Sequence, residues 1–427
     1  MPERRPFRPA TVVDAATTGI AVALPLLPAL VPALIAVLLG GALWARFAGE
    51  RGPGRRLDWR SPLFWAALLY LLHVLGLLWT TNMDFAGLDL GIKASLLLFA
   101  FLALLGSPPV HVGRAIDAYV GANVLAVLLC LARAMFRAVR YLVVTLPDGE
   151  VTGFSLSVPF FSSGFAAFHH PSYMAMYLTL ALFLLAGRTT CRRLRSRQRV
   201  VVAAVLLMGI LLCASKAGWA VLLIAAIAVL LLHRRDARLR RTVTWGLGAT
   251  LLAGATLIAT NGLMRERVVQ VLDVLRGEGG GTANSTSDRR MVWDAAARLI
   301  AARPWAGVGT GDVKDELLRA YADLGYVDPL EKRLNAHDQY LNTGVALGIP
   351  GLMLVVLLVL VPLVPGLRNG DTTLTAFLAL NALNWTVESM LEVQAGVVFL
   401  AFFSWLFVHA PHRPLPAGTQ HTTHPGP

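Results

Sequence analysis

Residues 335–366 read NAHDQYLNTGVALGIPGLMLVVLLVLVPLVPG, a polar string that runs directly into a long apolar one. The apolar part is long enough to cross a bilayer as a helix, for which about 20 residues suffice. His337 lies at the junction, where water meets the membrane, and its imidazole exchanges protons near neutral pH. The stretch therefore predicts a membrane protein with a candidate proton-transfer group at the membrane surface.

The composition extends this prediction to the whole chain. Of its 427 residues, 56% are hydrophobic and only 15% are charged. Apolar runs of about 17–25 residues recur, each long enough to span a bilayer. Helices satisfy their own backbone hydrogen bonds in lipid. We therefore predict an all-α polytopic integral membrane protein, in contact with membrane lipids.

The apolar runs predict about 12 transmembrane helices. Pro25, Pro28 and Pro32 divide residues 11–46 into a hairpin of two spans. The other ten are expected at 62–80, 92–106, 115–132, 172–187, 200–214, 218–233, 242–260, 339–366, 372–387 and 393–410. The domains are accordingly 1–260 with nine spans, the loop 261–338, 339–410 with three spans, and the tail 411–427.

The charge distribution predicts the orientation. The net charge is +13, and the basic residues cluster in short loops such as 46–60, 188–199 and 233–241. Lys and Arg keep such loops cytoplasmic, so both termini are expected inside and loop 261–338 outside. This explains the positive charge without nucleic acid. The polar residues of interest then share the outer side: Lys216, Arg265, Arg289, His337 and Glu388.

The large outer loop is expected to be folded. Ser287–Ala302 has the apolar periodicity of an amphipathic helix, with Ser287 or Asp288 near its cap. Asp312–Leu324 is predicted to be a second helix. Between them, Gly307–Gly311 lacks the Lys-Ser/Thr ending of a phosphate loop, so no nucleotide is expected. No spacing of His, Cys or Asp residues suggests a metal site, so no cofactor is expected.

Several cations accompany His337 on the outer side. Arg265 directly follows the ninth span, Arg289 lies in the loop helix, and Lys216 lies at the tip of a tight turn. Each is either an interfacial anchor or a ligand for a polyanion such as a diphosphate.

A basic stripe leaves the fifth span. Arg133, Arg137 and Arg140 have helical spacing and either bind a phosphorylated lipid head group or form a plain amphipathic interface. Glu388 and Glu392 are expected to share a helical face and to balance the arginines. A catalytic acid role is not favoured for them.

Residues 288–352 resemble the polymerase/ligase superfamily of bacterial surface polysaccharides. The resemblance rests on Arg289, Trp293, the string RPWAGVG (303–309), the string HDQYL (337–341), and Gly344, Gly348 and Gly351. The overall plan of about twelve spans, a large outer loop between the ninth and tenth, and the turn at 215–218 is similar to the O-antigen ligase family.

The resemblance implies a glycosyltransferase with GT-C-like architecture in the bacterial inner membrane, its active site facing the periplasm. Such a ligase moves O-antigen from undecaprenyl diphosphate to lipid A–core without metal or nucleotide. His337 corresponds to the essential histidine of the family, and Arg265 to an arginine at the same point of the loop. At Lys216 relatives often have Arg, and at Asp338 they more often have Asn or Ser.

The residues fit this chemistry. When a sugar hydroxyl attacks an anomeric carbon, a base must take its proton and positive charge must stabilise the departing diphosphate. His337 is the expected base, and Arg265, with Lys216 or Arg289, the expected positive charge. A single displacement inverts the anomeric centre. We therefore predict an inverting transfer with His337 and Arg265 as catalytic residues.

Three alternatives remain at this stage. An O-antigen polymerase or an O-linked protein glycosyltransferase of the same superfamily uses a similar donor with a different acceptor. A polysaccharide-lipid transporter is a different class. It is expected to show inverted repeats, broken helices and charged residues inside spans, and the sequence suggests only His73 of this kind.

Overall fold

The computed structural model describes residues 8–50, 52, 57–141, 143, 158–187, 191, 194–232, 237–260, 262, 265, 269 and 285–408. Every regular element in these ranges is a helix. Most of 261–284 and the whole predicted tail 411–427 lie outside the described residues.

A helix lies at each range that was predicted to span the membrane. These helices are α1 (Pro9–Leu26), α2 (Val31–Phe47), α3 (Pro62–Leu75), α4 (Met83–Leu105), α5 (Val112–Arg140), α6 (Pro171–Ala186), α7 (Ser196–Leu212), α8 (Lys216–Leu232), α9 (Ala237–Thr260), α14 (Gln339–Arg368), α15 (Thr372–Trp385) and α16 (Gln394–Val408). Short 3₁₀ turns are η1 (Pro28–Leu30), η2 (Gly76–Trp79), η4 (Val158–Phe160), η5 (Ser162–Gly164) and η6 (Met390–Glu392). Among the described residues, seven helices are long and apolar enough to cross a membrane. The chain is thus an all-helical, multi-pass membrane protein, whereas the number of twelve crossings stays a prediction.

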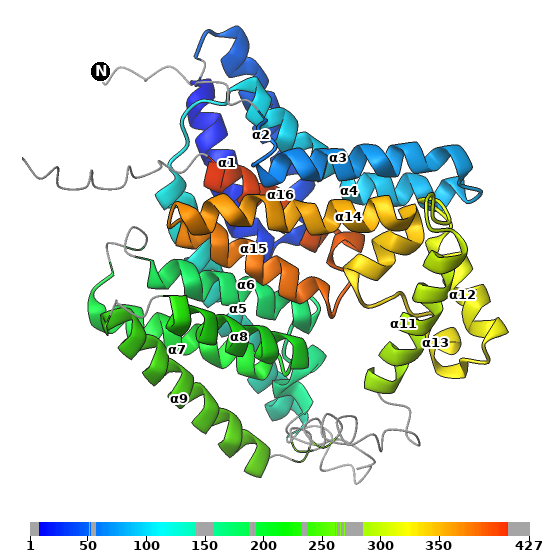
Figure 1. The fold of residues 1–427 in the computed structure, drawn as a ribbon. Coiled ribbons are helices and arrows are strands. Elements are labelled where there is room, and N and C mark those ends of the chain that lie inside the picture. The colour runs from blue at the N-terminus through cyan, green and yellow to red at the C-terminus, as the bar shows by residue number, and fades with distance from the viewer. Residues whose placement is uncertain are drawn as a thin grey trace, which may run out of the picture.

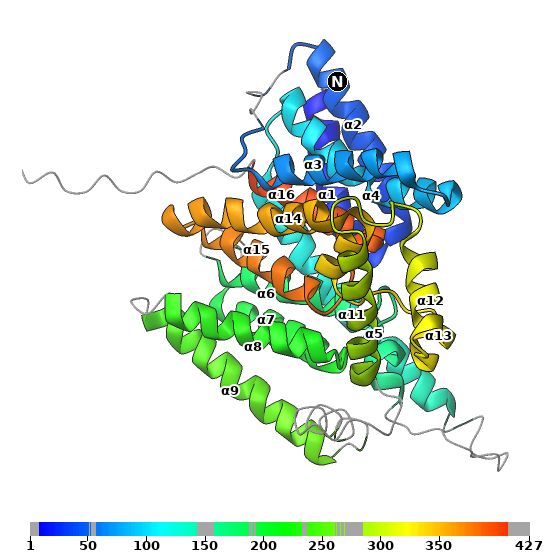
Figure 2. The same cartoon turned by 45° about the vertical axis from the view of Figure 1, so that its right-hand side comes forward.

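Between α9 and α14, the described residues form three further helices: α11 (Ser285–Ala302), α12 (Val313–Asp323) and α13 (Val327–Glu331). The two helices predicted in this segment are confirmed, and α13 was not predicted. Figures 1 and 2 show the three together across one end of the long helices, next to the start of α14. Buried Val292, Leu317 and Tyr321 give the segment an apolar interior, so it is folded.

The centre of the bundle is aromatic. From Gly396 to Phe407, every residue of α16 is buried, as expected for a helix that is apolar on all sides. Phe399 stacks on Tyr177 of α6, and Phe403 packs edge-on against Tyr119 of α5. This packing fixes α16 and the connection before it, which carries Glu388.

Helix α4 begins earlier than predicted. The sequence suggested a span from residue 92, but α4 starts at Met83, where the Asn82 side chain accepts a hydrogen bond from the Phe85 amide at 3.0 Å. Asp89 and Lys93 therefore lie inside the helix. They are buried and pair with each other one turn apart, which explains how the bundle accommodates them.

Helix α14 is broken at Gly348, which has φ 68° and ψ −162°. Pro350 has no N–H to donate to the Ala346 carbonyl, and the Gly309 amide donates there instead, at 3.0 Å. A neighbouring exchange pairs the Ile349 amide with the Pro304 carbonyl at 2.7 Å. Residues 304–309 therefore supply backbone hydrogen bonds that the broken helix lacks. We call this contact between residues 304–309 and α14 the dock.

A second anchor joins α12 to the α3–α4 connection. The Asp312 carboxylate accepts hydrogen bonds from both the amide and the hydroxyl of Thr81 and from the Asn82 amide, each at 2.8 Å. Thr310 donates to the carbonyl of His73 at 2.6 Å. The α11–α13 segment is thereby held on the membrane part at two places, which sets the position of α11 over the site described next.

Candidate active site

His337 lies two residues before Gln339, the first residue of α14. Its neighbour Asp338 caps the helix, because the Asp338 carboxylate accepts a hydrogen bond from the Leu341 amide at 2.8 Å. The His337 backbone has φ 46°, in the left-handed region, and its amide donates to the Asn335 side chain at 3.0 Å. The cap and this turn direct the imidazole away from the α14 axis, and its side chain stays 29% exposed.

A buried carboxylate faces the imidazole. His337 Nδ1 lies 3.2 Å from Oε2 of Glu388, whose side chain is only 11% exposed. Glu388 follows α15, where its amide donates to the Asn384 carbonyl at 3.0 Å. Because Nδ1 faces the carboxylate, Nε2 is the ring nitrogen left to face a substrate. Histidine and glutamate thus form a dyad in which the carboxylate can orient the ring.

The surroundings of Glu388 favour its ionised form. Burial alone raises the pKa of the Glu388 carboxyl. The hydrogen bond and charge of His337, with the charges of Arg289 and His170, outweigh that effect and hold the pKa below its ordinary value. Glu388 is therefore a carboxylate at neutral pH.

Arg289 of α11 contacts the second oxygen of the Glu388 carboxylate. Its Nη2 lies 3.5 Å from Glu388 Oε1, and its side chain is 22% exposed. Its Nε is buried without a hydrogen-bond partner among the described residues. An arginine with donors to spare beside an open imidazole is suited to bind an anion.

Two serines link the dyad to the α7–α8 turn. The hydroxyl of Ser172, in the first turn of α6, lies 3.3 Å from Glu388 Oε1 and 3.4 Å from the Ser215 hydroxyl. Ser215 immediately precedes Lys216, the half-buried first residue of α8. The turn that carries Lys216 therefore reaches the site.

The other predicted site residues have different contacts. Arg133 and Arg137 both lie in α5, so their predicted helical spacing is confirmed, and both approach the Gly164 carbonyl, at 3.5 and 3.4 Å. Arg265 is exposed and donates to the Ala259 carbonyl of α9 at 2.8 Å. No contact described in the structure joins these three arginines to His337.

The two glutamates do not share a helical face, so that expectation is wrong. Glu388 lies in the connection after α15 and contacts His337, whereas Glu392 ends η6 and contacts Lys93 at 3.0 Å. The helix stops after Trp385 and the chain turns, which points the two carboxylates to different partners. The balancing role expected for Glu388 is confirmed by its contact with Arg289.

Sequence reasoning missed the parts of the site that α6 contributes. Ser172 contacts Glu388, and exposed His170, at the N-terminal boundary of α6, adds charge beside it. The available signal was the polar string before a span, Phe168-His169-His170-Pro171, on the predicted outer side. Seryl hydroxyls in apolar helices give no comparable signal.

The arrangement is suited to proton transfer next to an anion. Nε2 of His337 can take a proton while Glu388 stabilises the imidazolium, and Arg289 supplies positive charge. No group of three or more His, Cys, Asp or Glu side chains in the described ranges is arranged to hold a metal ion. Independence from metal nevertheless stays a prediction.

Comparison with known proteins bears on this site. No curated protein matches the chain. Residues 201–356 match a family model described as O-antigen ligase. The matched part runs from within α7 to within α14 and contains Lys216, Arg265, Arg289 and His337, whereas Glu388 lies beyond it. The matched segment covers less than half of the chain, and it supports a relationship to the O-antigen ligase family.

Proposed function

We propose that the protein is an O-antigen ligase that transfers O-polysaccharide from undecaprenyl diphosphate to a sugar hydroxyl of lipid A–core. The family match supports a glycan-transferring enzyme of the ligase and polymerase type. The observation that carries the proposal is the His337–Glu388 dyad beside Arg289, because this set provides a base and a cation at one point.

His337 is the general base. The acceptor oxygen attacks the anomeric carbon, Nε2 takes the hydroxyl proton, and the carbon–oxygen bond to the diphosphate breaks with its electron pair leaving on the diphosphate. Glu388 keeps the proton of neutral His337 on Nδ1, so that Nε2 is free to accept, and then stabilises the imidazolium. The 3.2 Å contact between the two side chains supports both roles.

The transfer inverts the anomeric centre. Retention requires a carboxylate that is free to attack the sugar. Glu388 is engaged at both oxygens, by His337 at one and by Ser172 and Arg289 at the other. Because the Glu388 carboxylate is engaged, direct attack by the acceptor hydroxyl on the anomeric carbon is favoured over a covalent intermediate on Glu388, and direct attack inverts the centre.

The departing diphosphate is bound by Arg289 and Lys216. Arg289 offers a fork of donors, and Lys216 a point charge from the turn next to Ser215. Arg265 is proposed to join them when substrate is bound. Arg133 and Arg137, in α5, are proposed to bind the phosphorylated head group of the lipid.

The proposed location is the bacterial inner membrane, with the active site facing the periplasm. Its support is the basic residues of the opposite loops and the convergence of α6, α8, α11 and α14 at one end of the bundle. The partners are the lipid-linked glycan, lipid A–core and membrane lipids. No nucleotide, nucleic acid or cofactor enters the reaction.

A polysaccharide-lipid transporter is the second candidate. The break in α14 and the charged pair inside α4 are two features expected of transporters. The break is filled by backbone hydrogen bonds from residues 304–309 of the same chain, which leaves ligase function better supported.

The test is product analysis with purified protein, lipid-linked O-polysaccharide, lipid A–core and chelator, without nucleotide. A ladder on lipid A–core supports the ligase. Longer carrier-linked chains without lipid A–core identify a polymerase, and transfer to protein identifies a protein glycosyltransferase. His337→Ala is expected to abolish the ladder, and unchanged activity in that variant would end the general-base assignment.

His111→Ala is the matched control. His111 Nδ1 faces a carboxylate in the same way, lying 3.1 Å from Asp14 Oδ1, and its side chain is 68% exposed. It precedes α5, and no described contact joins it to His337. Its loss should leave the ladder intact.

A further inference from the structure

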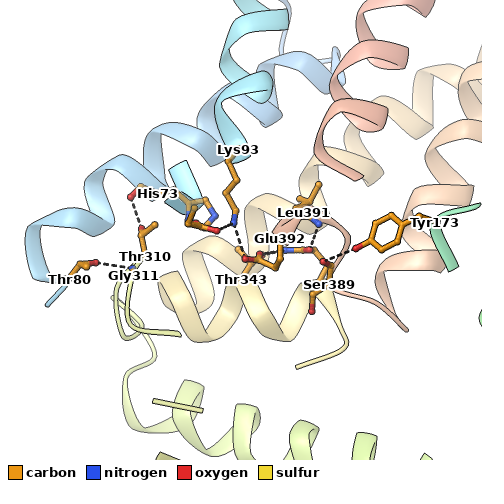
Figure 3. A network of polar contacts seen from close by, with 12 residues as sticks. His73, Thr80, Lys93, Tyr173, Thr310, Gly311, Thr343, Ser389, Leu391 and Glu392 are labelled. Atoms are coloured by element: carbon orange, nitrogen blue, oxygen red, sulfur yellow. Dashed lines mark hydrogen bonds and ion pairs between the residues drawn. The ribbon is translucent and has the colours of Figure 1, made fainter. Parts of the chain in front are cut away.

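A buried polar network lies beside the dyad, within the membrane part of the bundle. Lys93 of α4 contacts both Asp89 of the same helix and Glu392 at the end of η6, the latter at 3.0 Å (Figure 3). Lys93 is 1% exposed and Asp89 4%. One ammonium thus holds two carboxylates, one of them from a segment about 300 residues away in sequence.

Gln339 extends this network to the start of α14. Its Nε2 donates to Glu392 Oε1 at 3.2 Å and to the Thr343 hydroxyl at 2.9 Å. Its Oε1 accepts from the Leu391 amide at 2.6 Å. Both N–H groups and the carbonyl oxygen of this buried amide are thereby hydrogen-bonded to η6 or to α14 itself, which fixes the start of α14 against η6.

The network joins the two segments that carry the dyad. Gln339 lies two residues after His337, and Glu392 lies four residues after Glu388. The Ser389 hydroxyl adds a contact to the Asp338 carbonyl at 3.4 Å, and its own carbonyl accepts from Tyr173 at 3.5 Å (Figure 3). The 3.2 Å approach of imidazole and carboxylate thus occurs between two backbones that Gln339 and Glu392 hold together.

We propose that Lys93, Glu392 and Gln339 are positioning residues that hold Glu388 against His337 for the transfer reaction. This inference rests on the proposed function. Lys93 neutralises the partly buried Glu392 carboxylate. Glu392 and Gln339 hold the η6 segment on α14, and that segment presents Glu388 to the imidazole of His337. None of the three touches the reacting atoms.

A buried ion pair joins two segments at a cost in desolvation free energy, which is justified where the segments must have a fixed relative geometry. Removing one partner leaves the other charge buried and unpaired, which is strongly destabilising, whereas apolar packing would bring the same helices together. Asp89 and Glu392 share one ammonium, and His73 of α3 lies 4.0 Å from Asp89. The network therefore gives a fixed geometry that apolar contacts do not specify.

The experiment compares Lys93→Met and Gln339→Leu with wild type, alone and combined with Glu388→Gln. Gln339→Leu removes a neutral group and leaves the Lys93–Glu392 ion pair intact. It therefore still tests the inference if Lys93→Met folds poorly. Each single change is expected to lower kcat on the order of tenfold to a hundredfold, as misplacement of a catalytic group does. KM for the donor is expected to stay near the wild-type value.

Two readouts separate positioning from general stability. In the Glu388→Gln background the further loss in kcat should nearly vanish, because the carboxylate to be positioned is gone. Hydrogen–deuterium exchange of residues 386–393 should rise in both single variants. Arg114→Met, which removes the partner of Asp14 at the start of α5, is the control and should leave this exchange unchanged.

Unchanged exchange in 386–393, or losses in kcat that are as large with Glu388→Gln as without it, would overturn the inference. Failure of the proposed function is seen separately, as full activity in His337→Ala or as a product other than glycosylated lipid A–core, whatever the network variants do.

Discussion

The backbone of His337 adopts a conformation that is unfavourable for a residue with a Cβ. A φ of 46° costs a non-glycine residue about 1–3 kcal/mol, and such strain persists where the surroundings impose it. Here the Asn335 side chain, the Asp338 cap and the contact with Glu388 impose it. The strain directs the imidazole toward the carboxylate, which is consistent with a functional role.

Asp338 explains one departure from the family pattern. The resemblance implies that Asn or Ser is commoner after the histidine, and Asn, Ser and Asp all cap helices well. The Asp338 carboxylate does so here through the Leu341 amide. Burial raises the pKa of this carboxyl. The departure therefore leaves the local structure unchanged and does not count against the assignment of His337.

Arg289→Lys tests the role of the arginine fork. Lysine keeps the positive charge but loses the planar set of donors that grips two oxygens at once. We expect a higher KM for the lipid-linked donor and a kcat/KM that is lower by about tenfold, a loss of roughly 1.4 kcal/mol. Steady-state kinetics with varied donor checks this. Arg290→Lys, one residue on and exposed, is the control.

Glu388→Gln tests the electrostatics of the dyad by its effect on stability. The folded-state pKa of Glu388 lies below its ordinary value of 4.5, so the carboxylate stabilises the fold above that pH and loses its effect as the pH falls through the lowered pKa. The unfolding temperature of the variant should therefore fall below that of wild type by most at about pH 5.5 and by least at about pH 3.5. A difference that does not change with pH would show that ionised Glu388 is not stabilised by His337 and Arg289.

At the scale of elements, the dock between α14 and residues 304–309 is the least obvious feature. Gly348 and Gly307 both have positive φ, and a Cβ on either would lie 2.4 Å from a backbone carbonyl oxygen of the other segment. Only glycine permits this approach. The dock holds α11, and with it Arg289, over the start of α14.

Gly348→Ala is expected to weaken the contact between α14 and residues 304–309. The substitution adds both backbone strain and a clash with the Pro304 carbonyl, so unfolding should become easier by more than the about 1–3 kcal/mol of strain alone. Exchange of amides in 304–309 should rise and transfer activity should fall. Gly370→Ala provides the comparison, because Gly370 also has positive φ, 66°, but open space around it. Equal effects in the two variants would show that the dock contributes nothing.

Hydropathy predicted the helices well because apolar length is a local property of the chain. It placed the start of α4 nine residues late, since Asp84, Asp89 and Lys93 look like a loop until their partners are known. The partner of Lys93 is Glu392, near the other end of the chain. The break in α14 was missed for the same reason, because residues 304–309 replace its missing hydrogen bonds.

At the scale of the whole molecule, the site is assembled from five places. They are the start of α6, the α7–α8 turn, α11, the turn at His337 before α14 and the connection after α15. The sequence predicted that His337, Arg289 and Lys216 share one side, because alternating spans impose it. It gave no means to predict that Glu388 would contact His337, since that depends on how α15 ends against α14. Placement of Arg265 with them stays a prediction.

Cysteine labelling tests the predicted orientation. The native cysteines Cys130, Cys191 and Cys213 are buried and should react poorly. Arg319→Cys, on exposed α12, should be labelled by an impermeant maleimide that reaches only the periplasm. His111→Cys should be labelled only after the inner membrane is opened, because α4, with 23 residues or roughly 35 Å of helix, separates the two ends. The opposite pattern would place the site in the cytoplasm.

The most direct measurement is the single-turnover rate of glycan transfer to lipid A–core in four proteins: wild type, His337→Ala, Glu388→Gln and the double variant. Loss of a general base lowers such a rate by about 10²–10⁴-fold, which we predict for His337→Ala. Glu388→Gln should lose less, and the double variant should be no slower than His337→Ala, because the carboxylate acts through the ring. A wild-type rate in His337→Ala, or losses that multiply in the double variant, would contradict the dyad.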